Sequence, residues 1–532
     1  MTERPPAITR GELLLLAAIL LPLMVLRFSL HSGPGPYGVD GSYYTQVARN
    51  VAEGKGLVTN VCLYHQGLDP LPAPTNIYPL WPAVLGMSGR LVGFAAAVRD
   101  LPRLMYVLAL LALYFLARRI APEAQKIIGS LNVAHLMVAL FGLTPIFFSS
   151  TTFPYTEGLA FVMACVALAT SFRQGPVAAL SGGLLAGLAT LTRSQMLLLV
   201  FAIIVARCFA AVRDRLWKDF LLSILGAAAV LVPWLLYVET FTGSFALQNL
   251  WISYHQTPAI EPYQLGAQSE TTFDLWVLRL RGVLTMFNPA SNDSFFALFG
   301  AAALLVPVAA VHWIRRAAVK RNATISPGVL AMALSGLFLT GALLLTPARF
   351  FREWLFGWRH GLPLIFVIIL AVIELTGFGH RYLRRGAVAL VAISIVWGGI
   401  TVVRTVLAGP PGGLTPAERG LVRWLDTQDR ATVVLTTNAQ SLAPYSRVNF
   451  RWAACDDSAA TTKSILEHVR TDYVAVYEQE QLCTFARGIK DVVEPGPIFG
   501  VAPRQILLLR RRNARGPDVT SGSPARSPSR FP

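Results

Sequence analysis

The sequence predicts a polytopic α-helical membrane protein with a small soluble α/β domain at its C-terminal end. Of its 532 residues, 54% are hydrophobic and 14% are charged, whereas soluble chains carry about 25% charged residues. The mean hydropathy is +0.52, and apolar runs long enough to cross a bilayer recur as far as residue 406. Beyond residue 408, a Gly- and Pro-rich linker leads into alternating helix and strand patterns.

The distribution of charge indicates membrane topology. A net charge of +17 would point to nucleic acid in a soluble protein. Here, much of it falls in short loops between apolar runs, where Lys and Arg mark the cytosolic side. We therefore expect membrane lipids, and not nucleic acid, as partners. The five cysteines show no metal-ligand spacing. Among Cys62, Cys455 and Cys483, which are predicted to lie outside the cytosol, Cys455–Cys483 is the one disulfide pairing considered.

The first apolar run, at about 13–30, is predicted to be a retained span, because it is long and lacks a clear small-residue cleavage site. The outer loop 31–76 follows, and Asp40 stands in it between two glycines, ahead of an amphipathic helix that ends at Gly54 and Gly56. We expect this carboxylate in a turn at the membrane surface, close to a helix N-terminus that favours anions. A plain capping or turn role is the alternative.

Residues 77–98 are apolar, but two prolines begin the segment and Arg90 interrupts it. It fits either a short span or an interfacial helix. The loop charges favour the interfacial helix, because the next run, 101–116, then delivers Arg118 and Arg119 to the cytosol together with the later basic clusters. A spanning segment would turn those clusters outward.

The membrane module is predicted to cover residues 1–408. Its later spans are expected near 129–149, 154–172, 176–192, 194–212, 219–238, 294–314, 328–347, 360–378 and 386–406. With the first two runs they give about eleven transmembrane helices. An odd number of spans and a cytosolic N-terminus place the C-terminal domain outside the cytosol.

The soluble α/β domain is predicted at 409–512. Its periodicities indicate a helix, a buried strand, a helix followed by a strand, and a last strand, at 417–428, 431–438, 461–477 and 504–511. The tail 513–532 is rich in Ser, Pro and Arg, and we expect it to be disordered.

Polar residues near spans are costly and therefore informative. Four sets fall on the predicted outer side, formed by Asp40, Glu157, Arg193 and the neighbouring Arg359 and His360. Simpler roles exist: Glu157 as a helix cap, Arg193 as a snorkelling side chain, and the last pair as interface anchors. Their convergence on one membrane face nevertheless suits a phosphate-bearing lipid substrate. Arg matches the geometry of phosphate, and a carboxylate can take a proton from an attacking hydroxyl.

His255, in the long outer loop, is a further candidate, although a lone His is more often structural. The sequence shows no P-loop, no dinucleotide-binding glycine motif after a strand and no Ser–His–Asp signature. The function classes marked by those motifs are therefore not indicated.

The order of motifs resembles the GT-C membrane glycosyltransferases, especially the branch with protein O-mannosyltransferases and bacterial aminoarabinose transferases of lipid A. A first span precedes Asp40, a YY-x₃-A-R helix that begins at Tyr43, and a G-x-G. A YPLWPAVLG segment, a TEG turn, an LTR boundary at Arg193, a WRHGLPL span start and an α/β tail follow. The resemblance covers about the first 400 residues as architecture.

The resemblance implies a role for each matching residue. Asp40 corresponds to the acidic residue of the first outer loop, which is the catalytic base or orients the acceptor. Gly41 stands where many relatives carry a second acid, which weakens the case for a metal. Glu157 could supply that second carboxylate, so a divalent metal at Asp40 and Glu157 stays open. Arg193 and Arg359, with His360, correspond to phosphate-binding positions. Tyr43, Tyr44 and His255 are candidate donor or acceptor contacts.

The implied function is transfer of a sugar from a polyprenyl-phosphate donor to a glycolipid, polysaccharide or protein acceptor. It would proceed with inversion, with Asp40 as base, on the extracytoplasmic face of a bacterial inner membrane. The alternatives are a lipid or polysaccharide transporter or flippase, and a non-catalytic subunit of envelope assembly. Transporters tend to show internal repeats and charges at the bilayer midplane, whereas no repeat is found here and the polar sets lie at span ends.

Overall fold

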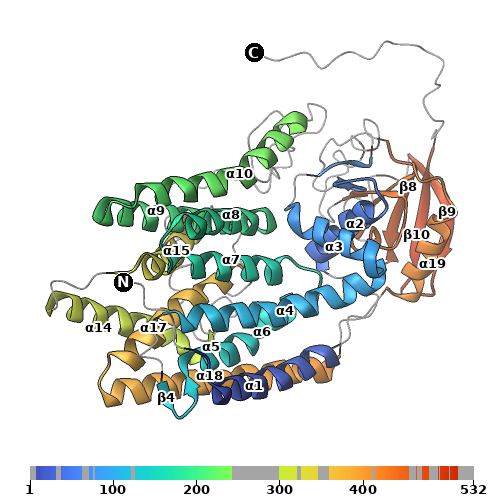
Figure 1. Cartoon of the computed structure of the whole chain (residues 1–532). Helices are drawn as coiled ribbons and strands as arrows, with labels where there is room; N and C mark the ends of the chain where they lie inside the picture. The colour runs from blue at the N-terminus through green and yellow to red at the C-terminus, as the bar shows by residue number, and fades with distance from the viewer. Residues whose placement is uncertain are drawn as a thin grey trace, which may run out of the picture. The chain divides into compact units, whose positions relative to one another are not determined.

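The computed structural model (Figure 1) divides into two compact units. Among the described residues, the helical unit contains those up to Thr59 and those between Pro74 and Gly409, and the C-terminal unit contains those within Asn60–Ala73 and those from Leu414 onward. The structure describes residues 7–30, 38–62, 71–75, 78–120, 126–242, 299–319, 325–345, 359–409, 414–453, 463, 466, 470–478, 489, 492–502 and 504–512.

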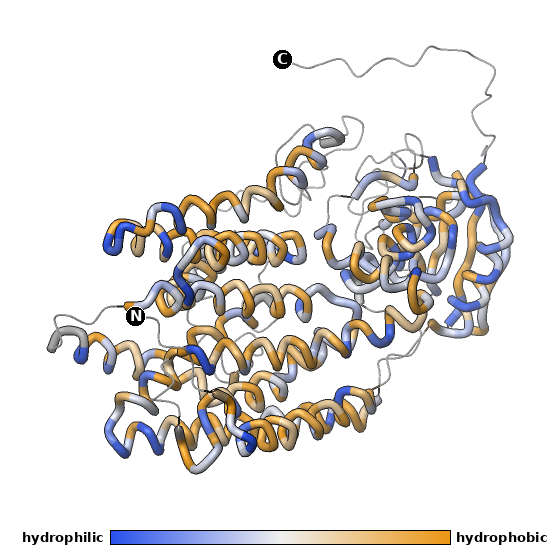
Figure 2. The backbone as a smooth tube through the Cα atoms, in the orientation of Figure 1, coloured by the Kyte–Doolittle hydropathy of each residue, from blue (hydrophilic) through white to orange (hydrophobic). Residues whose placement is uncertain are grey.

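The helical unit is an integral membrane bundle. Five of its described helices are long and apolar enough to cross a bilayer, namely α1 (Arg10–Ser29), α4 (Phe94–Arg118), α9 (Leu197–Asp214) with the preceding 3-10 turn η2 (Ser194–Met196), α10 (Trp217–Thr242) and α18 (Arg381–Ala408). Shorter apolar helices accompany them: α5 (Val133–Gly142), α7 (Glu157–Ser171), α8 (Pro176–Thr192), α15 (Pro327–Leu345) and α17 (Ile365–Gly377). Figure 2 shows that apolar residues dominate along these helices, as the composition predicted.

Smaller elements connect the helices. A hairpin of β4 (Lys126–Ile128) and β5 (Leu131–Asn132) precedes α5, and η3 (Gly300–Leu304) leads into α14 (Leu305–Val319). The 3-10 turn η4 (Arg359–Leu364) leads into α17.

The segment predicted as one span at 129–149 contains two helices, α5 and α6 (Pro145–Ser150). Pro145 has no N–H for the helical ladder, and a residue before proline is pushed out of the helical region. Thr144 accordingly adopts φ −64° and ψ 115°. The short α6 then ends at the turn that precedes α7.

Two glycines allow α8 and α10 to pack closely. A Cβ on Gly183 would lie 2.0 Å from the Ser223 carbonyl oxygen, and one on Gly226 would lie 2.2 Å from the Leu180 carbonyl oxygen. Such distances are excluded for a real Cβ atom, so this approach of the two backbones requires glycine, as in other membrane helix pairs.

At one end of the bundle, α2 (Gly38–Ala52) packs on α3 (Leu80–Val92) (Figure 1). The 13 residues of α3 extend about 20 Å at 1.5 Å per residue, which is short of a hydrocarbon core of about 30 Å. The interfacial helix expected at 77–98 stays a prediction, and residues 94–98 of that segment belong to α4. After Gly93 the chain enters α4 at Phe94, before the predicted start of that span.

The C-terminal unit is built on a mixed sheet. Its elements are α19 (Pro416–Leu425), β6 (Val433–Thr436), α20 (Ala439–Leu442), β7 (Asn449–Trp452), β8 (Tyr473–Tyr477), β9 (Val493–Phe499) and β10 (Ile506–Arg511). The strand order is β2-β7-β6-β8-β10-β9, with β6 parallel to β7 and β8, and β10 antiparallel to β8 and β9. The α/β class and the strands β6, β8 and β10 match the sequence prediction. The prediction missed β7, which is short, and β9, an edge strand with two prolines.

The strand β2 (Val61–Cys62) comes from the first loop, which also contains β1 (Val58–Thr59) and β3 (Ala73–Pro74). It pairs in parallel with β7, placing Val61 beside Phe450. The Phe450 N–H donates to the Asn60 carbonyl at 2.8 Å, and the Asn60 amide donates to the Asn449 side chain at 2.9 Å. The unit predicted at 409–512 therefore also includes a piece of the first loop.

Candidate active site

Asp40 lies in the first turn of α2 and is half-buried. The flanking Gly38 and Gly41 were predicted to form a turn, but both are helical. Tyr44 follows one turn later on the same helix face. The carboxylate thus stands at a helix N-terminus, where backbone N–H groups and the helix dipole favour negative charge.

Polar side chains fix α2 in place. Gln46 and Asn50 of this amphipathic helix are both buried. The Asn50 amide donates to the Val58 carbonyl at 2.9 Å, and the Thr59 hydroxyl donates to Gln46 Oε1 at 3.2 Å. These two hydrogen bonds tie α2 to the segment that follows it. They therefore hold α2, and the backbone of Asp40, in a fixed position.

Tyr78 connects α2 with the junction between α8 and α9. Its ring lies 6.2 Å from the Tyr44 ring, and its hydroxyl shares a hydrogen bond with Ser194 Oγ at 3.2 Å. Ser194 follows Arg193, which ends α8 with an extended backbone (φ −160°, ψ 118°). Because the helix ends here, the Arg193 side chain lies at the α2 end of the bundle.

Arg193 forms a buried ion pair with Glu157. Nη1 of Arg193 contacts Oε1 of Glu157, and Nε donates to Gln195 Oε1 at 2.7 Å. Glu157 is the first residue of α7, and only 2% of Glu157 and 5% of Arg193 is exposed. The interpretation of Arg193 as a snorkelling side chain is wrong, because its guanidinium is buried and paired.

The turn ahead of Glu157 is held from two sides. The buried Trp81 of α3 donates its indole N–H to the Pro154 carbonyl at 2.6 Å. The buried Arg27 of α1 donates to the Thr151 carbonyl, at the C-terminal end of α6, where a cation is favoured by the helix dipole. These contacts fix the start of α7 and with it the Glu157 carboxylate.

Arg27 and Arg103 are buried, although neither was predicted as a site residue. Arg103 of α4 pairs with Asp100 at 3.0 Å and lies 5.3 Å from the centre of the Phe28 ring. Its Nη2 donates to the Leu30 carbonyl, where α1 ends, at 3.4 Å. Both could have been found in the sequence, because each is an Arg within an apolar run. Such residues are rare and usually have a specific partner.

The remaining predicted residues are placed as follows. Tyr43 and Tyr44 are buried, and the Tyr43 hydroxyl is hydrogen-bonded to Thr75 Oγ1 at 3.1 Å. Arg359 and His360 begin η4, which packs against α6, the helix leading to the Glu157 turn. His255 lies outside the described residues, as do Cys455 and Cys483.

This end of the bundle contains two kinds of chemical group. One is the Asp40 carboxylate at the start of a helix, and the other is the buried Arg193 guanidinium, which is paired with the Glu157 carboxylate. A planar guanidinium can bind phosphate oxygens with two parallel hydrogen bonds. Among the described residues, no group of three His, Cys, Asp or Glu is arranged to hold a metal ion. Glu157 already engages a cation, Arg193.

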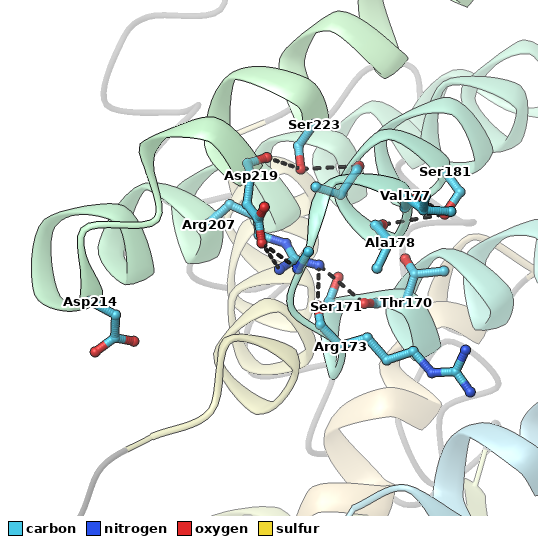
Figure 3. A network of polar contacts seen from close by, with 12 residues as sticks. Thr170, Ser171, Arg173, Val177, Ala178, Ser181, Arg207, Asp214, Asp219 and Ser223 are labelled. Carbon is cyan, nitrogen blue, oxygen red and sulfur yellow. Dashed lines mark hydrogen bonds and ion pairs between the residues drawn. The ribbon is translucent and has the colours of Figure 1, made fainter. Parts of the chain in front are cut away.

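A second buried pair, shown in Figure 3, joins Arg207 to Asp219. Arg207 lies toward the C-terminal end of α9, which begins just after Arg193, so this pair is at the opposite end of the bundle. Nη2 of Arg207 donates to the carbonyls of Thr170 and Arg173, at 3.1 and 2.9 Å, where α7 ends. Its Nη1 lies 3.8 Å from Asp219 Oδ2, which accepts the Gly175 N–H at 2.7 Å. Arg207, Asp219 and these backbone groups form a clamp that joins α7, α8, α9 and α10.

Basic residues gather at the clamp end. The Arg119 side chain, just beyond α4, donates to the Ala169 carbonyl at 2.8 Å. Burial and the nearby Arg173 lower the pKa of Arg119. Arg213 and Arg215 follow at the end of α9.

Comparison with solved structures identifies the fold. The chain matches the oligosaccharyltransferase AglB of Archaeoglobus fulgidus, in complex with an inhibitory peptide and a dolichol-phosphate, with a TM-score of 0.59 and 11% identity. This match covers 96% of this chain and 75% of AglB. ArnT of Cupriavidus metallidurans, bound to undecaprenyl phosphate, matches with a TM-score of 0.53 and 14% identity, over 96% of this chain and 100% of ArnT.

The arabinofuranosyltransferase AftD from Mycobacteria also matches, with a TM-score of 0.50 and 15% identity, over 96% of this chain and 42% of AftD. No protein-family model and no curated protein sequence matches the chain. At identities this low the matches establish a shared fold. They confirm the predicted resemblance in fold to GT-C glycosyltransferases and extend it from about the first 400 residues to nearly the whole chain.

Proposed function

We propose that this protein is a membrane glycosyltransferase that moves a sugar from a polyprenyl-phosphate donor to an acceptor hydroxyl. The observation that carries the proposal is the contact path from the helix of Asp40 to the Arg193–Glu157 pair. Tyr44 of α2 lies against Tyr78, and Tyr78 is hydrogen-bonded to the residue after Arg193. A candidate base and a candidate phosphate ligand are thereby held at one end of a membrane bundle.

The shared fold supports the class of donor. The AglB structure contains a dolichol-phosphate and the ArnT structure an undecaprenyl phosphate. A prenyl chain stays in the lipid, so its phosphate can reach a protein only where helices end at the membrane surface. Asp40 and Arg193 lie at such helix ends.

The proposed reaction is a single displacement at the anomeric carbon. Asp40 accepts the proton of the acceptor hydroxyl, whose oxygen forms the new bond to the anomeric carbon. The bond from that carbon to the phosphate oxygen breaks, and polyprenyl phosphate leaves with the electron pair. Arg193, oriented by Glu157, stabilises the charge that develops on the phosphate, with Arg359 and His360 as further candidates. The product has the inverted configuration, and no step is routed through a metal.

The distribution of basic residues supports an extracytoplasmic site. Arg119, Arg173, Arg213 and Arg215 lie at the end opposite α2, and such clusters mark the cytosolic side. The α2 end, with Asp40, then faces outward, and a bacterial inner membrane is the proposed location. Nothing in the described residues favours a flippase.

The test is transfer by purified protein in proteoliposomes, given polyprenyl-phosphate sugars that carry a radiolabelled sugar and an extract of envelope glycans as acceptor. The expected result is labelled glycan whose new linkage is inverted, as determined by NMR. A retained configuration would contradict the proposed displacement. Movement of the labelled lipid between leaflets without any transfer would instead identify a flippase.

A further inference from the structure

The sheet of the C-terminal unit contains a topological switch point. The chain leaves β6 for β7 on one side and then crosses to β8 on the other side, and β6 is parallel to both. In open α/β sheets with this order, the loops that leave the carboxyl ends of the two central strands diverge. Ligands bind at that position.

Polar residues lie where these two strands end. Thr437 and Asn438 follow β6, while Tyr477 ends β8 and Glu478 follows it. The two strands pair as far as Leu435 and Val474, so these four residues lie at or just beyond the carboxyl ends of neighbouring parallel strands. All four polar residues are half-buried, as expected for side chains that line a site open to solvent.

Their hydrogen bonding presents a mixed set of donors and acceptors. Asn438 caps the start of α20, but its side chain makes no capping hydrogen bond. The Tyr477 hydroxyl donates to Glu418 Oε1 of α19 at 3.1 Å. The Gln505 N–H donates to Glu478 Oε2 at 3.3 Å. At and just beyond the ends of these two strands the chain therefore presents an amide, a phenol and a carboxylate, and the phenol is hydrogen-bonded to a second carboxylate, that of Glu418.

This chemistry favours a neutral, polyhydroxylated ligand. Sugar hydroxyls both donate and accept, so they can satisfy amide, carboxylate and phenol groups together. Two carboxylates oppose an anion, and α20, with 4 residues, is too short to provide a helix N-terminus for a phosphate. Among the described residues, no metal-holding group of acidic side chains is present either.

We propose that the carboxyl ends of β6 and β8 bind a neutral glycan through Asn438, Tyr477 and Glu478. This glycan is the acceptor chain, or a repeat of it, that the enzyme extends. Glycan binding at this site stands on the geometry of the sheet alone. Its identification as the acceptor rests on the proposed function.

The experiment uses the full chain in nanodiscs on an array of neutral oligosaccharides with furanose and pyranose residues. The best binder is then titrated by calorimetry against wild type, Asn438→Leu and Glu478→Gln. Loss of one hydrogen bond to a charged group should weaken binding about tenfold or more. Gln428→Leu is the matched control, because it removes an amide at the amino edge of β6 and should leave the affinity unchanged. Thermal unfolding confirms that each variant is folded.

Absence of binding to every neutral glycan on the array would overturn the inference, as would equal affinities of wild type and both site variants. Competition by inorganic phosphate would also overturn it, since it would reveal an anion site. In transfer assays, Asn438→Leu should raise the KM for acceptor without lowering kcat. Glycan binding by a protein that transfers no sugar would support the glycan site while refuting the proposed function.

Discussion

Two buried arginine–carboxylate pairs occupy opposite ends of the helical unit, and they differ in what the guanidinium contacts. At the clamp, Arg207 donates to backbone carbonyls where α7 ends. At the α2 end, Arg193 contacts the side chains of Glu157 and Gln195. The carbonyl groups that Arg207 contacts are part of the helix backbone, so these hydrogen bonds can break only if the helix end unfolds locally. Side-chain partners can move when a ligand binds, so we propose that the clamp stabilises the fold and that the Arg193–Glu157 pair takes part in transfer.

The largest expected effect is on the rate of transfer at the α2 end. Asp40→Asn keeps the shape of the side chain but removes the general base, which should slow transfer by about 10²–10⁴-fold. The unfolding temperature should stay within experimental error of wild type. Transfer in proteoliposomes and thermal unfolding measure both quantities. Asp214→Asn, at the clamp end and outside the clamp, is the matched control. Near-normal transfer by Asp40→Asn would remove this residue from the role of base.

The next largest effect is on stability at the clamp. Arg207→Met leaves Asp219 buried without its cation and the carbonyls at the end of α7 without a donor. Breaking such a pair lowers the free energy of unfolding by about 3–5 kcal/mol. Chemical denaturation in detergent measures this change, while transfer per folded molecule should be unaffected. Arg213→Met removes an exposed pair as control and should change stability less. Wild-type stability of Arg207→Met would contradict the stabilising role proposed for the clamp.

A smaller effect is expected for Glu157→Gln. The amide can still accept a hydrogen bond from Arg193, so the protein should fold, but the guanidinium loses its charged partner. We expect transfer to fall about tenfold to a hundredfold, equivalent to about 1.4–2.8 kcal/mol in the barrier. Steady-state kinetics with varied donor would show whether kcat or KM changes. If stability fell as far as in Arg207→Met while transfer stayed normal, Glu157 would belong to a second clamp.

The smallest effect concerns the turn before Glu157. Trp81→Phe removes the indole donor to the Pro154 carbonyl, a hydrogen bond worth about 0.5–1.5 kcal/mol. The free energy of unfolding should therefore fall by about that amount, and the rate of transfer by about twofold to tenfold. Trp217→Phe, at the exposed start of α10, controls for the loss of an indole. An unchanged transfer rate in Trp81→Phe would show that α3 does not help to position Glu157.

The membrane helices were predictable because their signals are local. The start of α8 at Pro176 and its end before Arg193 coincide with the predicted span 176–192, since a proline begins that run and polar residues end it. The division of 129–149 into α5 and α6 also had a local cause, Pro145. The prediction of a single span followed the continuous hydropathy of the segment and did not take this proline into account. The strand β2 had no such signal, because two residues form a strand only when a partner strand is present.

The candidate site was predictable as a set of residues but not as an arrangement. Asp40, Glu157 and Arg193 were expected on one membrane face from the alternation of spans. The direct contact of Arg193 with Glu157, and the connection through Tyr78, depend on how α7, α8 and α3 pack, which no single segment encodes. Arg27 was missed because it lies inside the predicted span 13–30 and was given no role there, although its side chain is buried in the protein interior.

The pairing of β2 with β7 has a consequence for biogenesis. Asn60 and Asn449, whose side chains are hydrogen-bonded, are separated by 389 positions. At about 5–20 residues per second, the ribosome needs roughly 20–80 s to make the partner after the first strand has emerged. During that interval the backbone N–H and C=O groups of β2 that later pair with β7 have no strand partner. Newly made chains should therefore be vulnerable to proteases or dependent on chaperones in the compartment where this loop emerges, until translation has passed β7.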